Sequence, residues 1–194
     1  MVLKKPSLSK LYWGETSEYL TSGEGEDALT TDGDGIITFP RLRKLKLYRP
    51  WWPSIPEQLK NFGCTILYEV DAHTMSCHPL LHEQLFDRIV FNFPHAGFHY
   101  REYDSFQIEF HRNLVKGFLR SARDDMLGKN REAHVTHKTA HPFDRWEIEK
   151  LAEDVGWYLI EMSPFSSWDY LGCCNKRGDG IRVDDSFPVG ACST

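Results

Sequence analysis

Polar residues follow the strand-like runs of this sequence at positions where they could take part in chemistry. The run Arg88–Phe93 ends in Asn92-Phe93 and is followed by Pro94-His95. An amide and backbone carbonyls can hydrogen-bond the edge of a flat base, a proline stiffens the turn, and a flat side chain can stack on the ring. The turn therefore predicts a site for a planar, nitrogen-containing ring, although an ordinary strand-to-loop turn would look the same.

Two further strand-like runs also end in polar residues. Asp71 follows Val70, and Lys138-Thr139 closes the run that begins at Ala133. In an open sheet of parallel strands, ligands bind outside the carboxyl ends of the strands. We therefore expect these residues to line one crevice together with the turn at Asn92.

A set of metal-ligand residue types lies between these runs. His73, Cys77, His78 and His82 include four-residue spacings that would place them on one face of a helix. Pro79 interrupts such a helix. The sequence thus favours ordinary loop histidines and no metal, while a small zinc-binding protein remains the alternative.

The elements that must position these residues alternate between short apolar runs and longer helical stretches. Between Asp104 and Arg123, Phe110, Leu114, Phe118 and Ala122 recur every four residues, which predicts a helix with one apolar stripe. Asp144 with Glu147 predicts the start of a second helix, which Gly156 ends. The remaining expected elements are a short helix at 57–61 and strands at 65–70, 88–93, 133–138 and 157–162.

Strands separated by helices must run mostly parallel, because a parallel partner requires a crossover connection. The pattern therefore predicts an α/β protein with an open, doubly wound three-layer sheet. Residues 15–35 are acidic and glycine-rich and predict a loop, so we divide the chain into a loop-rich part at 1–62 and a core at 63–194.

Composition sets the broad class. A chain of 194 residues with 41% hydrophobic and 13% aromatic residues can form one globular domain. No stretch approaches the ~20 apolar residues that span a bilayer, and five cysteines without framework spacing suit a reducing compartment. We expect a soluble, intracellular protein that does not bind membranes.

The net charge of -5 argues against nucleic-acid binding through a general basic surface. Two local basic clusters could still contact phosphate, although the more ordinary explanation is a solvated face. They comprise Arg41, Arg43, Lys44, Lys46 and Arg49, and then Lys176, Arg177 and Arg182.

The stretch Phe-Asn-Phe-Pro-His-Ala-Gly-Phe at 91–98 and four later segments resemble one known family. The four later segments are His111–Val115, His134–Phe143, Asn175–Gly180 and Phe187–Thr194. In this order and spacing they resemble the domain that methylates N3 of a uridine in large-subunit ribosomal RNA, a class I methyltransferase. The resemblance covers about residue 63 to the carboxyl terminus and suggests a divergent plant paralogue.

The resemblance implies S-adenosylmethionine as cofactor, ribosomal RNA as partner, and a Rossmann-like three-layer fold. It implies catalytic roles for Asn92, Pro94, His95 and Lys138. The implied cofactor-binding residues are Gly23, Glu24, Gly25, Asp71, Ala72 and Asn92. The implied substrate-binding residues are Phe93, His137, Lys176 and Arg177. It also implies a nuclear or nucleolar location, with the cytoplasm as alternative, and leaves the oligomeric state unknown.

Two parts of the family pattern are altered. Only Gly23-Glu24-Gly25 corresponds to the glycine-rich turn that opens the family's domain. The aromatic and serine residues with which the family's next helix begins are missing after it. The next strand, expected at 36–39, leads into Pro40-Arg41 where the family has an acid for the ribose hydroxyls, and an arginine carries only donors. An inactive paralogue that binds RNA or protein is therefore the alternative function.

Overall fold

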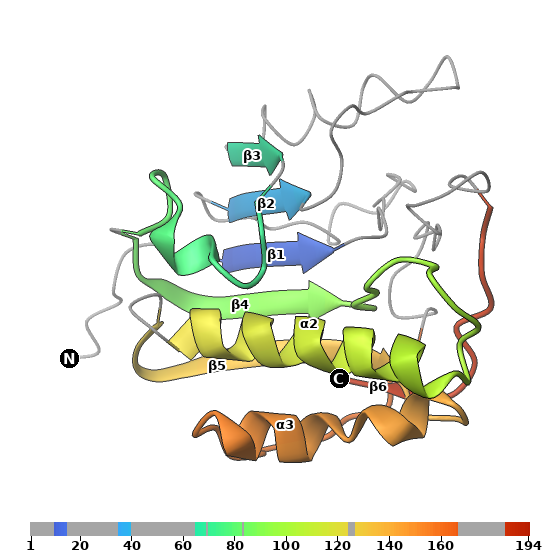
Figure 1. Cartoon of the computed structure of the whole chain (residues 1–194). Helices are drawn as coiled ribbons and strands as arrows, with labels where there is room; N and C mark the ends of the chain where they lie inside the picture. The colour runs from blue at the N-terminus through green and yellow to red at the C-terminus, as the bar shows by residue number, and fades with distance from the viewer. Residues whose placement is uncertain are drawn as a thin grey trace, which may run out of the picture.

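The computed structural model describes residues 10–14, 35–39, 65–68, 70–82, 84–123, 127–166 and 185–194. These residues form one six-stranded sheet with the strand order β3-β2-β1-β4-β5-β6 (Figure 1). The strands are β1 (Lys10–Gly14), β2 (Gly35–Phe39), β3 (Thr65–Tyr68), β4 (Phe86–Asn92), β5 (Leu127–Lys138) and β6 (Cys192–Ser193).

All strand pairs from β3 to β5 are parallel, and β6 pairs antiparallel with β5. The arrowheads of β1 to β4 point the same way in Figure 1. The register places Gly14 beside Asn92 and Asn92 beside Thr136, while Phe39 lies beside Tyr68. The carboxyl ends of these strands therefore meet at a single edge of the sheet, as the sequence analysis expected.

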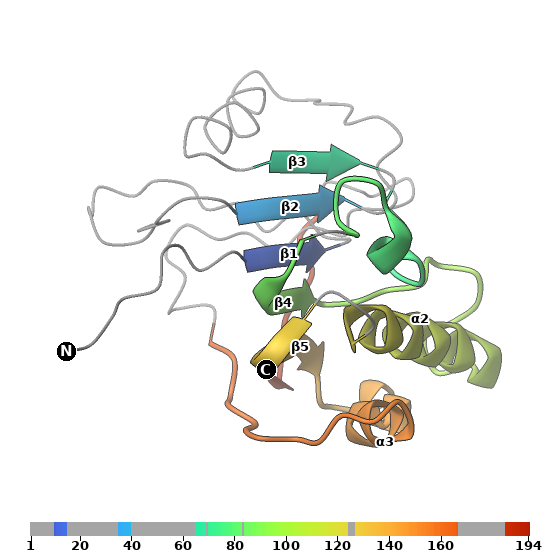
Figure 2. The ribbon, with the colours of Figure 1, turned by 90° about the vertical axis from the view of Figure 1, so that its left-hand side faces the viewer.

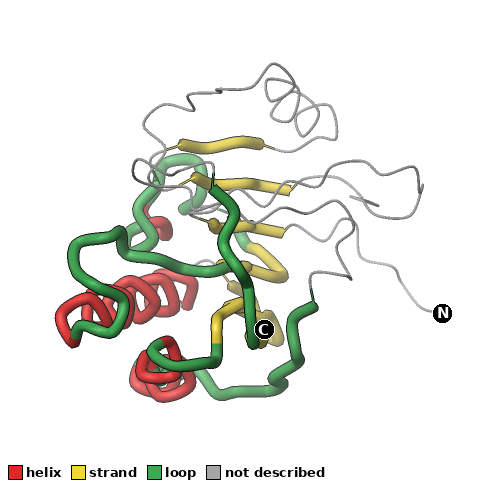
Figure 3. The backbone as a smooth tube through the Cα atoms, turned by 90° about the vertical axis from the view of Figure 1, so that its right-hand side faces the viewer, coloured by secondary structure: helices red, strands yellow, loops and turns green. Residues whose placement is uncertain are grey.

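The described helices lie on one face of the sheet. Helix α2 (Ser105–Arg123) runs along β4 and β5, and the short α3 (Ile148–Asp154) lies beside it (Figures 1 and 2). Figure 3 shows the same separation of helices and strands from the opposite side. No described helix is both long and apolar enough to cross a membrane.

The core lies between this helical face and the sheet, where β4 and α2 meet. Ile89 and Phe91 of β4 are fully buried, and the ring of Phe91 packs 4.9 Å from that of Phe118 in α2. Burying each such side chain contributes roughly 1.5–3 kcal/mol. This packing holds the carboxyl end of β4 and the start of α2 in a fixed relation, and the candidate site lies between them.

The predicted apolar stripe of α2 is largely correct. Leu114, Phe118 and Ala122 are buried, whereas Phe110 is 43% exposed. The inner face is formed there by Gln107 and His111, which are both fully buried. The inner face of α2 is therefore apolar toward its carboxyl end and polar toward its amino end.

The second predicted helix begins later than expected. Asp144 lies in a 3₁₀ turn, η2 (Phe143–Trp146), and α3 starts at Ile148 after Glu147 adopts a left-handed φ of 49°. This turn allows Trp146, only 2% exposed, to enter the core. The predicted end is confirmed, because Gly156 follows α3 with a φ of 84°.

The predicted strand at 157–162 is wrong. The segment has no strand, and Tyr158 and Ile160 are 80% and 73% exposed. The edge of β5 is instead occupied by β6, with His137 beside Ser193. The chain meets β6 just after this segment, where Ser163 and Phe165 hydrogen-bond to Thr194 and Cys192 around an isolated bridge between Pro164 and Ser193.

The α/β prediction is confirmed. Strands β1 and β2 precede residue 63 and pair with strands of the expected core, while the division at residue 62 stays a prediction. The helix expected at 57–61 lies outside the described residues. A second helical layer on the other face is not part of the described ranges, so the three-layer arrangement also stays a prediction.

Candidate functional site at the carboxyl end of β4

The turn after β4 is fixed by hydrogen bonds to β5. Phe93 has a left-handed φ of 46°, which is strained for a residue with a side chain, and its N–H donates to the Thr136 carbonyl at 2.8 Å. The Thr136 hydroxyl donates to Asn92 Oδ1 at 2.8 Å and lies 2.9 Å from the Thr194 hydroxyl. The surroundings thus hold Asn92 and a strained Phe93 in one conformation at the strand end.

Phe93 and Pro94 are part of the packed interior. The Phe93 ring is 7% exposed and lies edge-on to Phe165 and Phe187, with centroid distances of 5.4 and 5.6 Å. Pro94 is buried as well. In this structure the Phe93 ring therefore presents no face on which a base could stack, and its role in substrate binding stays a prediction.

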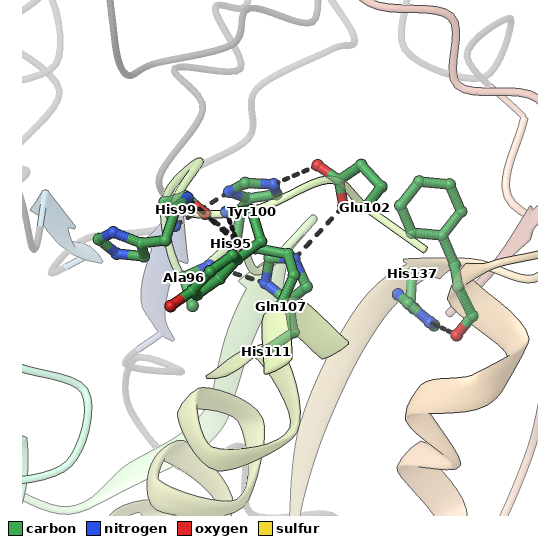
Figure 4. Close-up of polar contacts among 10 residues, drawn as sticks. His95, Ala96, His99, Tyr100, Glu102, Gln107, His111 and His137 are labelled. Atoms are coloured by element: carbon green, nitrogen blue, oxygen red, sulfur yellow. Dashed lines mark hydrogen bonds and ion pairs between the residues drawn. The ribbon is translucent and has the colours of Figure 1, made fainter. Parts of the chain in front are cut away.

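His95 belongs to a polar network with Glu102, His111 and Gln107 (Figure 4). Its side chain is 17% exposed, and its Nε2 lies 2.8 Å from Glu102 Oε1. Its Nδ1 accepts the N–H of Gly97 at 3.1 Å. A neutral imidazole has one donor and one acceptor nitrogen, so these contacts place the proton of His95 on Nε2.

A second histidine approaches the same carboxylate from α2. His111 is fully buried, its Nδ1 accepts the N–H of Ala96 at 3.0 Å, and its Nε2 lies 3.3 Å from Glu102 Oε2. A second donor, the Gln107 amide, lies 3.0 Å from His111 Nε2, so donors face both nitrogens of this ring. The hydrogen bond that reaches Glu102 therefore comes from His95.

Gln107 holds the loop between the two histidines. Its Oε1 accepts the N–H groups of His99 and Tyr100 at 3.1 and 2.8 Å, and its amide nitrogen donates to the Gly97 carbonyl. That nitrogen also lies 3.0 Å from His111 Nε2. A single buried side chain thus satisfies three backbone groups of the loop 97–100 (Figure 4).

The charge of the network resides on Glu102. Burial opposes ionisation of this carboxyl, but the polar contacts with His111 and His95 outweigh it and lower the pKa of Glu102 to about 2. Glu102 Oε2 is buried, and the His111 contact at 3.3 Å is too poorly aligned to count as a hydrogen bond. We regard that contact as mainly electrostatic, so His95 provides the short hydrogen bond.

The same three residues have the types and spacing of a metal site. The ligand atoms of His95, Glu102 and His111 all lie within 4.8 Å of one another. A histidine bound to a metal through Nε2 offers a lone pair there and usually donates from Nδ1. Here His95 Nδ1 accepts a backbone N–H, so its Nε2 is a donor to Glu102 and offers no lone pair there. The arrangement thus favours a hydrogen-bonded carboxylate over a metal centre.

The histidines and cysteine noted in the sequence do not gather around one point. His78 Nδ1 accepts the Leu80 N–H at 3.2 Å, and His82 Nδ1 lies 3.0 Å from the Pro79 carbonyl. The only helical turn here is η1 (Met75–Cys77). Within the described residues these four side chains form no metal-binding group, and their hydrogen bonds are those of a loop.

His137 and Lys138, at the end of β5, contact aromatic rings. His137 Nε2 donates to the Phe143 carbonyl at 2.9 Å, and its ring lies 4.4 Å from that of Trp146. Burial lowers the pKa of His137 to about 4. The Lys138 ammonium lies 5.0 Å from the Phe143 ring centre and 4.8 Å from that of Phe187, which is cation–π distance.

Asp71 and Ala72 follow β3 at the same edge of the sheet. Asp71 is exposed, and its Oδ1 accepts the His73 N–H at 2.8 Å, which is the geometry of an Asx turn. Ala72 is 2% exposed and belongs to the core. Gly23, Glu24, Gly25, Lys176 and Arg177 lie outside the described residues, so their predicted roles stay predictions.

The structure also brings forward residues that the sequence analysis gave no role. Gly14 ends the central strand β1 beside Asn92, and the apolar run Leu11-Tyr12-Trp13 before it was the available signal. Gln107 and His111 lie at helical spacing in line with the apolar stripe of α2. Polar residues at such core positions were the sequence signal that could have identified them. No sequence pattern pointed to Glu102.

Comparison with known proteins agrees with the motifs. Residues 42–177 match the family model BMT5-like, described as rRNA (uridine-N3-)-methyltransferase BTM5-like. The chain is 52% identical over 139 residues to the Arabidopsis thaliana protein "Uncharacterized protein At4g26485". It is 48% identical over 136 residues to "Heavy metal-associated isoprenylated plant protein 41" of the same plant, and each match covers 70% of this chain.

A more distant relative comes from mouse. "Ferredoxin-fold anticodon-binding domain-containing protein 1 homolog" is 29% identical over 121 residues, which cover 57% of this chain and 18% of that protein. The matches span 66% and 26% of the two Arabidopsis proteins. No solved structure matches this chain.

Proposed function

Because the chain belongs to the BMT5-like family, whose model is described as an rRNA (uridine-N3-)-methyltransferase, we propose that it methylates N3 of a uridine in large-subunit ribosomal RNA with S-adenosylmethionine as methyl donor. The observation that carries the proposal is the convergence of Gly14, Asn92 and the end of β5 at one edge of a parallel sheet. Such an edge is where open α/β sheets bind ligands.

The described residues fit the cofactor in two respects. Gly14 has no side chain at the carboxyl end of the central strand, which leaves the backbone open to close approach by a ligand. Asp71 offers an exposed carboxylate after β3. Together with the strand order β3-β2-β1-β4-β5, these features support the proposal of a class I methyltransferase fold.

The reaction requires removal of the N3 proton, because N3 of uracil is protonated at neutral pH. When bound, S-adenosylmethionine supplies an electrophilic methyl group to which the N3 lone pair bonds while the carbon–sulfur bond breaks. We assign proton acceptance to His95, recognition of the base edge to Asn92, and stabilisation of negative charge on the uracil oxygens to Lys138. Pro94 stiffens the turn that presents Asn92 and His95.

A protein without activity that binds RNA or another protein is the second candidate. It is favoured by Pro40 and Arg41, which follow β2 where a carboxylate would accept the ribose hydroxyls. It is also favoured by the internal hydrogen bonds of both His95 nitrogens, since a base must expose a lone pair to its substrate.

The decisive experiment has two arms on the purified chain. Isothermal titration with S-adenosylmethionine measures cofactor binding, and methylation of in vitro-transcribed large-subunit ribosomal RNA is followed by mass spectrometry of the nucleosides. We expect cofactor-dependent formation of N3-methyluridine. Absence of binding at millimolar cofactor, with a folded protein by circular dichroism, would reject the enzyme and leave the binding module.

The proposed substrate implies a place in the cell. Large-subunit ribosomal RNA is made in the nucleolus, so we propose a nucleolar or nuclear location for the chain, with the cytoplasm as the alternative. A fluorescent fusion viewed beside a nucleolar marker tests this part independently of catalysis.

A further inference from the structure

We propose that Glu102 is a positioning residue that holds His95 in the Nε2–H tautomer and so reserves His95 Nδ1 as the basic nitrogen of the site. This inference rests on the proposed methyl transfer. It assigns a role to a residue outside every motif by which the chain resembles its family, and it explains why a histidine already bonded at both nitrogens can still act as a base.

The geometry of the pair supports the assignment. The Nε2–Oε1 distance of 2.8 Å is that of a charge-assisted hydrogen bond, and the carboxylate is the acceptor that makes Nε2 the protonated nitrogen. Among the described residues, His95 Nδ1 accepts from the N–H of Gly97, two residues along the same loop, at 3.1 Å. Because this contact is local and long, an approaching imide N–H can replace it.

The second histidine keeps the acceptor charged. His111, on α2, is fully buried and directs its Nε2 toward the other carboxylate oxygen, while Ala96 fixes its ring from Nδ1. The low pKa of Glu102 agrees with this arrangement. The titratable groups that face the carboxylate are His95 on the loop and His111 on the helix, and both favour its ionised form.

The proton can be followed through the step. The uridine N3–H would donate to His95 Nδ1, the N–H bond would break, and its electron pair would stay on N3, from which it could bond the methyl group as the carbon–sulfur bond of the donor breaks. His95 becomes an imidazolium whose positive charge lies against the Glu102 carboxylate, which keeps accepting from Nε2. The proton then leaves to water from His95 once the methylated RNA has dissociated, because Nδ1 is on the side of the ring that is not held by Glu102.

The test compares Glu102→Gln with Glu109→Gln. Glutamine retains the size of glutamate and removes the charge. Glu109 is a control on α2 with a 61% exposed side chain and a weak pair to Arg112 at 3.6 Å. We expect Glu102→Gln to lower kcat roughly 100-fold, to leave KM for RNA within about threefold, and to move the acid limb of the pH–kcat curve. Glu109→Gln should leave all three unchanged.

A readout without catalysis separates this inference from the proposed function. Nitrogen-15 NMR of histidine-labelled wild-type protein at pH 7.5 should show His95 protonated at Nε2 and unprotonated at Nδ1. The Nε2–H resonance should move upfield in Glu102→Gln and stay in place in Glu109→Gln. A wild-type protein with this signature but no methylation would refute only the proposed function.

Three results would overturn the role of Glu102 itself. The first is a His95 protonated at Nδ1 in the wild-type protein, which needs no variant to fold. The second is a Glu102→Gln protein with the same urea midpoint, His95 spectrum and pH profile as Glu109→Gln. The third is one equivalent of zinc bound to the purified protein and lost in Glu102→Gln, because that would make these residues ligands.

Discussion

Single residues in this protein often have a structural contact that limits the chemistry they can do. The predicted group Asn92, Phe93, His95, His137 and Lys138 lies at the ends of β4 and β5, as the strand pattern implied. The sequence could not show that the Phe93 ring is buried or that His137 hydrogen-bonds the Phe143 carbonyl. Those facts depend on Phe165, Phe187 and Trp146, which are distant in the chain.

Replacing Asn92 by alanine tests the placement of the site. The change removes the acceptor of the Thr136 hydroxyl, which still has Thr194 as a partner, so we expect the free energy of unfolding to fall by only about 1 kcal/mol. Methylation should be lost, because the amide would recognise the base. Urea denaturation and the methylation assay measure the two effects.

Asn113→Ala provides the matched control for this prediction. Asn113 is an exposed residue of α2, so its replacement should leave both stability and methylation unchanged within about 0.5 kcal/mol and twofold. Full activity in Asn92→Ala would show that the site lies elsewhere.

Helices and strands could be predicted from the sequence where the periodicity of the apolar residues matched their burial. The α2 helix spans Ser105–Arg123, against an expectation of 104–123, because its apolar stripe is long and regular. The start of α3 was misplaced because burial of Trp146 requires a 3₁₀ turn that local capping signals do not reveal. The expected strand at 157–162 failed because β6, from the far end of the chain, pairs with β5 instead.

The end of α3 allows a test of backbone conformation. Gly156 has a φ of 84°, and an added Cβ would lie 2.8 Å from the Arg123 guanidinium, which itself donates to the Val155 carbonyl. Gly190 has a φ of 64° with nothing within 4 Å of an added Cβ. Alanine at either position incurs the left-handed strain of about 1 kcal/mol.

We therefore expect Gly156→Ala to destabilise the protein more than Gly190→Ala, by roughly another 1 kcal/mol for displacing Arg123. Chemical denaturation of the two variants beside the wild type gives this difference directly. Equal losses would mean that the Arg123 side chain moves aside without penalty.

The whole molecule combines a parallel sheet with a buried ionisable network on its helical face. A partly buried neutral histidine, His137, and a partly buried ionised carboxyl, Glu102, both resist protonation in the folded state, with pKa values of about 4 and about 2. Neither feature follows from local sequence, because each depends on the packing of the β4–α2 loop, α2 and η2 around β5. Both should make the stability of the protein sensitive to acid.

The stability of the folded protein depends on pH in the same direction for both groups. Between pH 6.5 and about 4 the unfolded chain binds a proton at His137 and the folded protein does not, so stability falls as the pH is lowered through this window. Between pH 4.5 and about 2 the unfolded chain binds a proton at Glu102 and the folded protein does not, so stability falls as the pH is lowered through this window as well. From pH 7.5 to 5.5 the His137 contribution amounts to about 1.4 kcal/mol.

Urea midpoints at a series of pH values test both windows. In Glu102→Gln the loss between pH 7.5 and 5.5 should persist, because it belongs to His137. The stability gap between wild type and Glu102→Gln should close as the pH falls from 4.5 toward 2, because protonation removes the charge that distinguishes the two proteins. A gap that stays constant across this range would mean that Glu102 is not held ionised by His95 and His111, and the proton network would then have lost its central charge.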